Sequence, residues 1–82
     1  MSPWLADGER RYIVVASMRV VVHRHLDAPR AWHVTVHGRP ALPTTRLESA
    51  EVESAQHEAL RVVRATLLAA VAALVEAAQV QR

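Results

Sequence analysis

The feature that most constrains the fold is the run from Leu47 to Gln81, which contains no Gly and no Pro. Because these two residues most often end helices, their absence predicts one long helix over about residues 45–81. A helix of about 33 residues is about 50 Å long at 1.5 Å per residue. Thr45 followed by Glu48 is a capping-box pattern, and it predicts that the helix begins at Thr45.

Within this helix the segment Ala65–Ala78, ATLLAAVAALVEAA, has only Thr66 and Glu76 as polar side chains. Its 14 residues are fewer than the roughly 20 that a bilayer-crossing helix needs. Between Leu60 and Val80 two apolar stripes can be drawn on the helix, of which a sheet can cover only one. The first contains Leu60, Val63, Leu67, Ala70 or Val71, and Leu74. The second, the candidate partner-binding stripe, contains Val62, Ala65, Leu68, Ala69, Ala72 and Val75.

Three arrangements would cover this second stripe. A second copy of the chain could pack its own helix there, and Ala-rich faces favour such close approach, so we expect a homodimer through the C-terminal helix. A different protein could occupy the stripe instead. A helix break within residues 55–61, with two shorter helices folding back on each other, is the third arrangement.

The strands are predicted in the first half of the chain. The β-branched stretch Tyr12–Leu26, YIVVASMRVVVHRHL, indicates two short strands or one bulged strand, with the interruption near Ser17–Arg19. In AWHVTVHG, residues 31–38, apolar and polar residues alternate as in a half-buried strand. We therefore expect one α+β domain over residues 1–82: strands within about 10–38, a loop at 39–44, then the helix. The sheet has two or three antiparallel strands, with the helix on one face in the order β-β-β-α.

Pairing Leu26 with Trp32 aligns the two clearest strands and separates their apolar and polar side chains. In this register Arg24 lies opposite Val34, Val22 opposite Val36, and Val20 opposite Gly38. The buried face then holds Val20, Val22, Leu26, Trp32, Val34 and Val36, with Arg24 as a polar exception. The polar face holds Arg19, Val21, His23, His25, His33, Thr35, His37 and Arg39, with His25 opposite His33.

Apart from Val21, these polar-face residues are the candidate partner-binding residues of the sheet. Such a face is a solvated surface, a binding surface for an acidic protein or nucleic acid, a metal site, or a pH-sensitive interface. His23, His25 and His33 carry the metal alternative. No carboxylate is placed to support those rings, so we predict no metal and no cofactor.

No catalytic residues are predicted, and the chain is not expected to be an enzyme. HEALR, residues 57–61, approaches the zinc-protease pattern His-Glu-x-x-His, but Arg61 occupies the second ligand position and cannot bind a cation. Glu53, His57, Glu58 and Arg61 are instead expected to form surface pairs along the helix. With only Gly8 and Gly38, the chain has no Gly-rich phosphate loop.

Charge and cysteine content bear on partners and compartment. Residues 1–42 contain six Arg and three acidic residues, whereas residues 43–82 contain four Arg and five acidic residues. The basic character therefore lies with the strands. The absence of Cys argues against a secreted disulfide-bonded protein, and residues 1–12 lack a signal-peptide pattern. We expect no membrane association and a location in the cytoplasm of a bacterial host.

The run AWHVTVHGRPALPTTRLESAEVESA, within about residues 31–60, resembles small phage and mobile-element proteins of the anti-CRISPR type. In these a strand leads through a short loop into a capped, Ala-rich helix. The resemblance implies a non-enzymatic inhibitor that binds and blocks a host protein or ribonucleoprotein complex. A dimeric nucleic-acid-binding or regulatory protein using the Arg/His face is the second hypothesis. A structural subunit of a larger assembly is the third.

Overall fold

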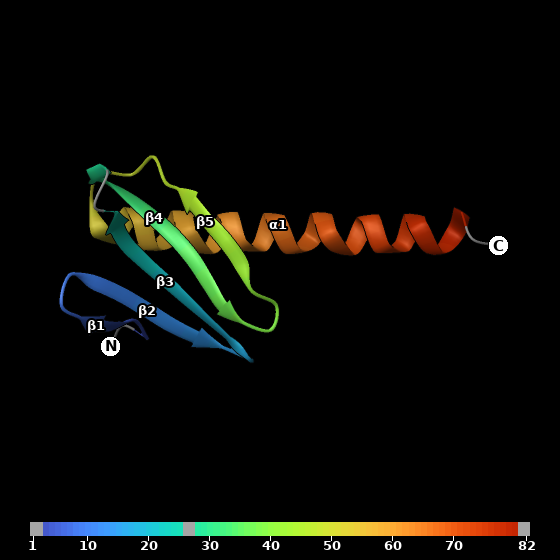
Figure 1. Cartoon of the computed structure of the whole chain (residues 1–82), viewed down its shortest axis with the longest axis horizontal. Coiled ribbons are helices and arrows are strands. Elements are labelled where there is room, and N and C mark those ends of the chain that lie inside the picture. Colours follow the sequence, from blue (N-terminus) through green and yellow to red (C-terminus); the bar gives the residue numbers. More distant parts are fainter. Residues whose placement is uncertain (1–2, 26–27, 81–82) are drawn as a thin grey trace.

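A computed structural model describes residues 3–25 and 28–80, without the side chains of residues 25 and 28–30. In these residues a five-stranded antiparallel sheet, in the order β1-β2-β3-β4-β5, is followed by one helix, α1. The elements are β1 Leu5–Asp7, β2 Arg10–Val15, β3 Met18–His25, β4 Ala28–Gly38, β5 Leu42–Arg46 and α1 Val52–Val80. The expected α+β fold with the helix on one face is confirmed, although the sheet has more strands than the predicted two or three (Figure 1).

The β-branched stretch forms two strands, as one of the two alternatives predicted. β2 and β3 are joined by Ala16 and Ser17, since Val15 pairs directly with Met18. Ala16 has a φ of 53°, in the left-handed region that an alanine adopts only with strain. At the same end of the sheet Gly38 has a φ of 116°, and a Cβ there would overlap the carbonyl oxygen of Ser17. Only glycine therefore fits the end of β4.

The predicted register between β3 and β4 is wrong by two residues. Trp32 lies opposite Arg24, Val34 opposite Val22, and Val36 opposite Val20. The ladder is irregular between Arg24 and His25, and His25 pairs with Ala28, so the connection is shorter than the predicted five-residue loop. Leu26, on which the predicted register depended, lies outside the described residues. Because side chains alternate with a period of two, a shift of two residues changes the partners but preserves both faces.

The predicted loop at 39–44 and the helix start at Thr45 are also wrong. Residues 42–46 form β5 on the edge of β4, with Thr45 opposite Val34, and the Leu47 amide extends the pairing by donating to the Trp32 carbonyl at 2.8 Å. The indole Nε1 of Trp32 donates to the Ala50 carbonyl at 3.0 Å. These contacts hold the segment after β5 against the sheet and α1 begins only at Val52, so sheet pairing overrides the capping-box pattern.

The core lies between α1 and the inner face of the sheet. The buried residues are Val20, Val22, Trp32, Val34, Val36, Leu47, Ala55, Ala59 and Val63. Small alanines on α1 let the helix axis approach β3 and β4 closely. The helix is continuous over its 29 residues, which excludes the predicted break within residues 55–61. It runs far past the sheet, and the molecule measures 50 × 27 × 18 Å along its principal axes (Figure 1).

Candidate interaction surfaces

The sheet face turned away from α1, here called the outer sheet face, carries most of the polar residues predicted for partner binding. Arg19 and His37 are direct neighbours, as are His23 and His33, and Thr35 lies between these pairs on β4. The prediction that His25 lies opposite His33 is wrong, because His23 occupies that place. The side chain of His25 is outside the described residues, and Arg39 lies in the exposed turn after β4.

The two described central histidines are held by specific contacts. His23 Nε2 lies 2.8 Å from the Thr35 hydroxyl, which in turn lies 2.7 Å from the Thr44 hydroxyl on β5. The His23 and His33 rings stack with centroids 6.0 Å apart and an interplanar angle of 23°. Across the described part of the chain, no three His, Asp or Glu side chains gather as they do around a metal ion.

A hollow of about 320 Å³ opens on the outer sheet face over β1 to β4. It is lined by Asp7, Arg10, Tyr12, Arg19, Val21 and His37. The Arg19 guanidinium carbon lies 4.1 Å from the centroid of the Tyr12 ring, a cation–π contact. Sequence reasoning did not assign Tyr12 to this face, because it did not place β2 beside β3. The pairing of Tyr12 with Val21 puts an aromatic ring and two cations around one hollow.

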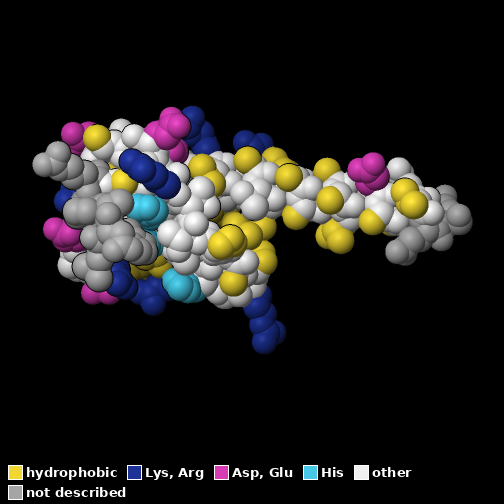
Figure 2. All heavy atoms as spheres, turned by 45° about the horizontal axis from the view of Figure 1, so that its top comes forward, with side chains coloured by type: hydrophobic (Ala, Val, Ile, Leu, Met, Phe, Trp, Pro, Cys, Tyr) yellow, Lys and Arg dark blue, Asp and Glu magenta, His cyan; other side chains and the backbone are white. Residues whose placement is uncertain are grey.

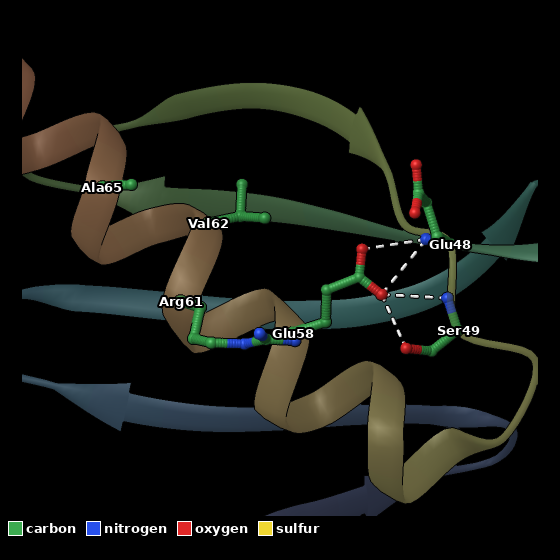
Figure 3. Close-up of a pocket in the computed structure, with 6 residues that line it drawn as sticks. All are labelled: Glu48, Ser49, Glu58, Arg61, Val62 and Ala65. Carbon is green, nitrogen blue, oxygen red and sulfur yellow. Dashed lines mark hydrogen bonds between the residues drawn. The ribbon is translucent and has the colours of Figure 1, made fainter.

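A second cluster joins α1 to the segment before it (Figure 3). The Glu58 carboxylate accepts hydrogen bonds from the Glu48 amide at 2.9 and 3.1 Å, from the Ser49 amide at 2.9 Å and from the Ser49 hydroxyl at 2.6 Å. Glu58 therefore holds residues 48–49 against the side of the helix. It was expected to take part only in surface pairs along α1, and no local spacing in the sequence signals a contact nine or ten residues away.

These bonds also determine what Glu58 can do chemically. The hydroxyl hydrogen bond from Ser49 lowers the pKa of Glu58, as do the backbone amides of Glu48 and Ser49 and the nearby charge of Arg61. Desolvation acts in the opposite direction but does not prevail. A carboxylate whose lone pairs are engaged and whose pKa is lowered is a poor general base near neutral pH. We interpret this cluster as a structural clamp.

The part of α1 beyond the sheet, Leu68–Val80, is here called the projecting segment. Every residue in it is exposed, including Val71 at 56% and Leu74 at 70%. Figure 2 shows apolar side chains along this segment, whose acidic residue is Glu76. Exposure on this scale is unusual, because contiguous apolar patches on soluble monomers most often mark association surfaces.

The two predicted apolar stripes do not match the buried and exposed sides of α1. Val62, assigned to the partner-binding stripe, packs partly against the core, whereas Leu60 of the sheet stripe is 36% exposed. Beyond Leu67 neither stripe is covered within the described molecule. Of the predicted partner-binding residues, Ala65, Leu68, Ala69, Ala72 and Val75 are all exposed.

An apolar groove of about 300 Å³ lies where α1 passes the turn between β2 and β3. Its walls include Val15 and Met18 from that hairpin, and Leu60, Leu67, Leu68 and Val71 from α1. Figure 2 shows apolar side chains gathered at this junction and continuing along the helix. The groove and the projecting segment are therefore one continuous apolar surface.

No family model matches the chain, and no significant match was found among curated proteins or solved structures. As described over residues 52–80, α1 does not combine the length and apolar character that crossing a lipid bilayer requires.

Proposed function

We propose that the chain is a non-enzymatic protein-interaction module whose working surface is the projecting segment of α1 together with the adjoining groove. One observation carries the proposal: Leu68, Val71, Leu74 and Val75 are each more than half exposed on a helix that runs past its own sheet. Burial of a fully exposed Val or Leu side chain contributes about 1.5–3 kcal/mol, so covering these side chains, each more than half exposed, contributes roughly half of that apiece. A protein surface that covers all four side chains gains hydrophobic free energy, which is the dominant favourable contribution to most protein–protein association.

In its most concrete form, the module is a small inhibitor that binds and blocks a host protein or ribonucleoprotein complex in the bacterial cytoplasm. The resemblance of residues 31–60 to anti-CRISPR proteins supports this form. Small inhibitors of this kind act by occupying a surface and need no catalytic residues. The outer sheet face, with Arg19 and His37 exposed, offers a second contact surface for an acidic patch on the same target.

Affinity capture from a bacterial lysate tests the proposal with two matched variants. One replaces Leu68, Val71, Leu74 and Val75 by Gln, and the other replaces Arg10, Arg19 and Arg46 by Gln. We expect a host protein that co-purifies with the unchanged chain to be lost with the helix variant and weakened with the sheet variant. Equal capture by the unchanged chain and the helix variant, with circular dichroism showing both folded, would contradict the proposal.

The composition of the outer sheet face favours nucleic-acid binding as a second candidate function. Arg10 and Arg19 flank the hollow with Tyr12, and Arg46 lies opposite His33 on the same face. Arg pairs with phosphates, and aromatic rings stack on unpaired bases. Tyr12 therefore supplies one aromatic ring for base stacking on this face, which the sequence alone did not reveal.

Fluorescence anisotropy with random single-stranded and duplex oligonucleotides tests this second candidate. Three phosphate contacts predict a slope of log affinity against log salt of about −2 to −3. Replacing Arg10, Arg19 and Arg46 by Gln should then abolish most of the salt dependence. Absence of binding at 50 mM salt would eliminate this candidate and leave the protein-interaction proposal untouched.

A further inference from the structure

We infer that the occupant of the groove is a second copy of this chain, whose α1 lies antiparallel beside the first and inserts its projecting segment into the groove. The inference rests on the proposed function and assigns one side of its apolar surface, the groove and the helix side that continues it, to a second copy, which leaves Ala65, Ala69 and Ala72 exposed for another protein. It is carried by four features: the width of the sheet, the spacing of residues along α1, the position of the groove and the charges along the helix.

The sheet is wider than one helix. Five strands spaced about 4.8 Å apart span about 19 Å, whereas a helix with its side chains is about 10–12 Å across. α1 packs on β3 and β4, so the inner side of β2 lies beside the helix. There Val15 remains 42% exposed, and Ile13 is only partly buried. A second helix laid next to α1 would cover this part of the sheet.

One line of residues along α1 has the spacing that paired helices require. Leu60, Arg64, Leu67, Val71, Leu74 and Ala78 follow one another at alternating steps of four and three residues. This is the seam of a two-helix coiled coil, in which alternating steps keep one side of each helix facing its partner. Four of these residues, from Leu60 to Val71, line the groove, and the remaining two continue the line onto the projecting segment.

The surface is self-complementary in an antiparallel pair. A twofold axis crosses the seam at the level of residue 69 along the helix. It places Leu60 opposite Ala78 of the second copy, Arg64 opposite Leu74, and Leu67 opposite Val71. The projecting half of each helix then lies in the groove of the other copy. A single interface therefore buries the groove and the projecting segment of both copies. A parallel pair would instead place each residue opposite its own copy, which brings the two Arg64 side chains together and both sheets to the same end of the pair.

The charges favour the same arrangement. The last turn of α1, ending at Val80, contains no basic residue, although cations stabilise the partial negative charge at a helix C-terminus. In the antiparallel pair Arg61 and Arg64 of one copy lie beside the final turns of the other. The aliphatic stem of Arg64 can cover Leu74 of the second copy while its guanidinium remains in water.

Sedimentation velocity over 1–100 µM tests the pairing with two variants that add the same charge to the same helix. Leu74→Glu places it on the seam, whereas Ala69→Glu places it about 140° away around the helix, on the predicted alanine stripe. We expect a dimer for the unchanged chain, at least about a 100-fold weaker dimer for Leu74→Glu, and little change for Ala69→Glu. If Ala69→Glu weakens the dimer more than Leu74→Glu does, the helices pair through the candidate partner-binding stripe and the inferred seam is wrong.

Because the chain has no Cys, single introduced cysteines can report the orientation. Under mild oxidation, a mixture of Leu60→Cys and Ala78→Cys copies should form mixed disulfide dimers, while each variant alone should form few. Efficient cross-linking within each variant alone would indicate a parallel pair and overturn the inference. A monomer at every concentration would also overturn it, yet helix-dependent capture of another protein would still support the proposed function, so the two failures are distinguishable.

Discussion

The two halves of α1 differ in both composition and surroundings. In the first half Ala55, Ala59 and Val63 are buried against the sheet, whereas in the second half every residue from Leu68 to Val80 is exposed. Eight of the 16 residues from 52 to 67 are polar or charged, so the first half has a polar face towards solvent, whereas Glu76 and Gln79 are the only polar residues from 68 to 80. The difference teaches that the apolar character of this helix has two uses: the first half completes the core of the chain, and the second is available to another molecule.

The largest expected effect tests whether the projecting half depends on the packed half. Trp32→Ala removes a buried ring and the indole hydrogen bond to Ala50, which should cost about 3–5 kcal/mol of unfolding free energy. Because about 13 residues form only a marginal helix alone, helicity should be lost from both halves together. Circular dichroism during urea titration measures this. A helical signal that survives loss of the sheet would show that the projecting half forms its helix independently of the packed half.

One substitution made in each half measures the difference directly. Val63→Ala, at a residue 6% exposed, should lower the unfolding free energy by about 2 kcal/mol. Val71→Ala, at a residue 56% exposed, should change it by no more than about 0.5 kcal/mol in a dilute monomer. If the chain pairs as inferred, the cost of Val71→Ala should grow with protein concentration, whereas that of Val63→Ala should not.

The clamp at the beginning of α1 provides a smaller and pH-dependent test. Glu58→Gln should cost about 1 kcal/mol at pH 7, because the remaining hydrogen bonds lose their charge. The folded pKa of Glu58 is lowered, so its contribution is complete above the ordinary Glu value of about 4.3. It is lost as the pH falls through the lowered folded pKa. Chemical denaturation from pH 7 to pH 3 should show the variant and the unchanged chain converging.

The smallest effect concerns the hairpin that forms one wall of the groove. Ala16→Gly should raise the unfolding free energy by about 0.5 kcal/mol, because relief of the positive φ exceeds the extra entropy of glycine in the unfolded chain. Thermal denaturation measures the change. Destabilisation would show that the turn does not retain its left-handed residue in solution.

The faces of β3 and β4 could be predicted because alternation in WHVTV separates apolar from polar side chains on β4, and the predicted and observed registers, which differ by two residues, both then place Val20 and Val22 on the apolar face. The register itself could not, because it depends on a connection whose length the alternation does not specify. β5 was missed for a related reason. PTTR has no apolar alternation, and only the free edge of β4 and the bond from Leu47 to Trp32 make it a strand.

By itself the sequence determined a long helical region, a half-buried sheet and a basic first half, because periodicity and charge are local properties of the chain. Only the tertiary structure decided where α1 begins, which of its residues meet the sheet, and that Tyr12 shares a hollow with Arg19. Those outcomes depend on contacts between residues far apart in the chain. The length of the sheet under α1 is one such outcome, and it separates the apolar residues of α1 into those that join the core and those that remain exposed.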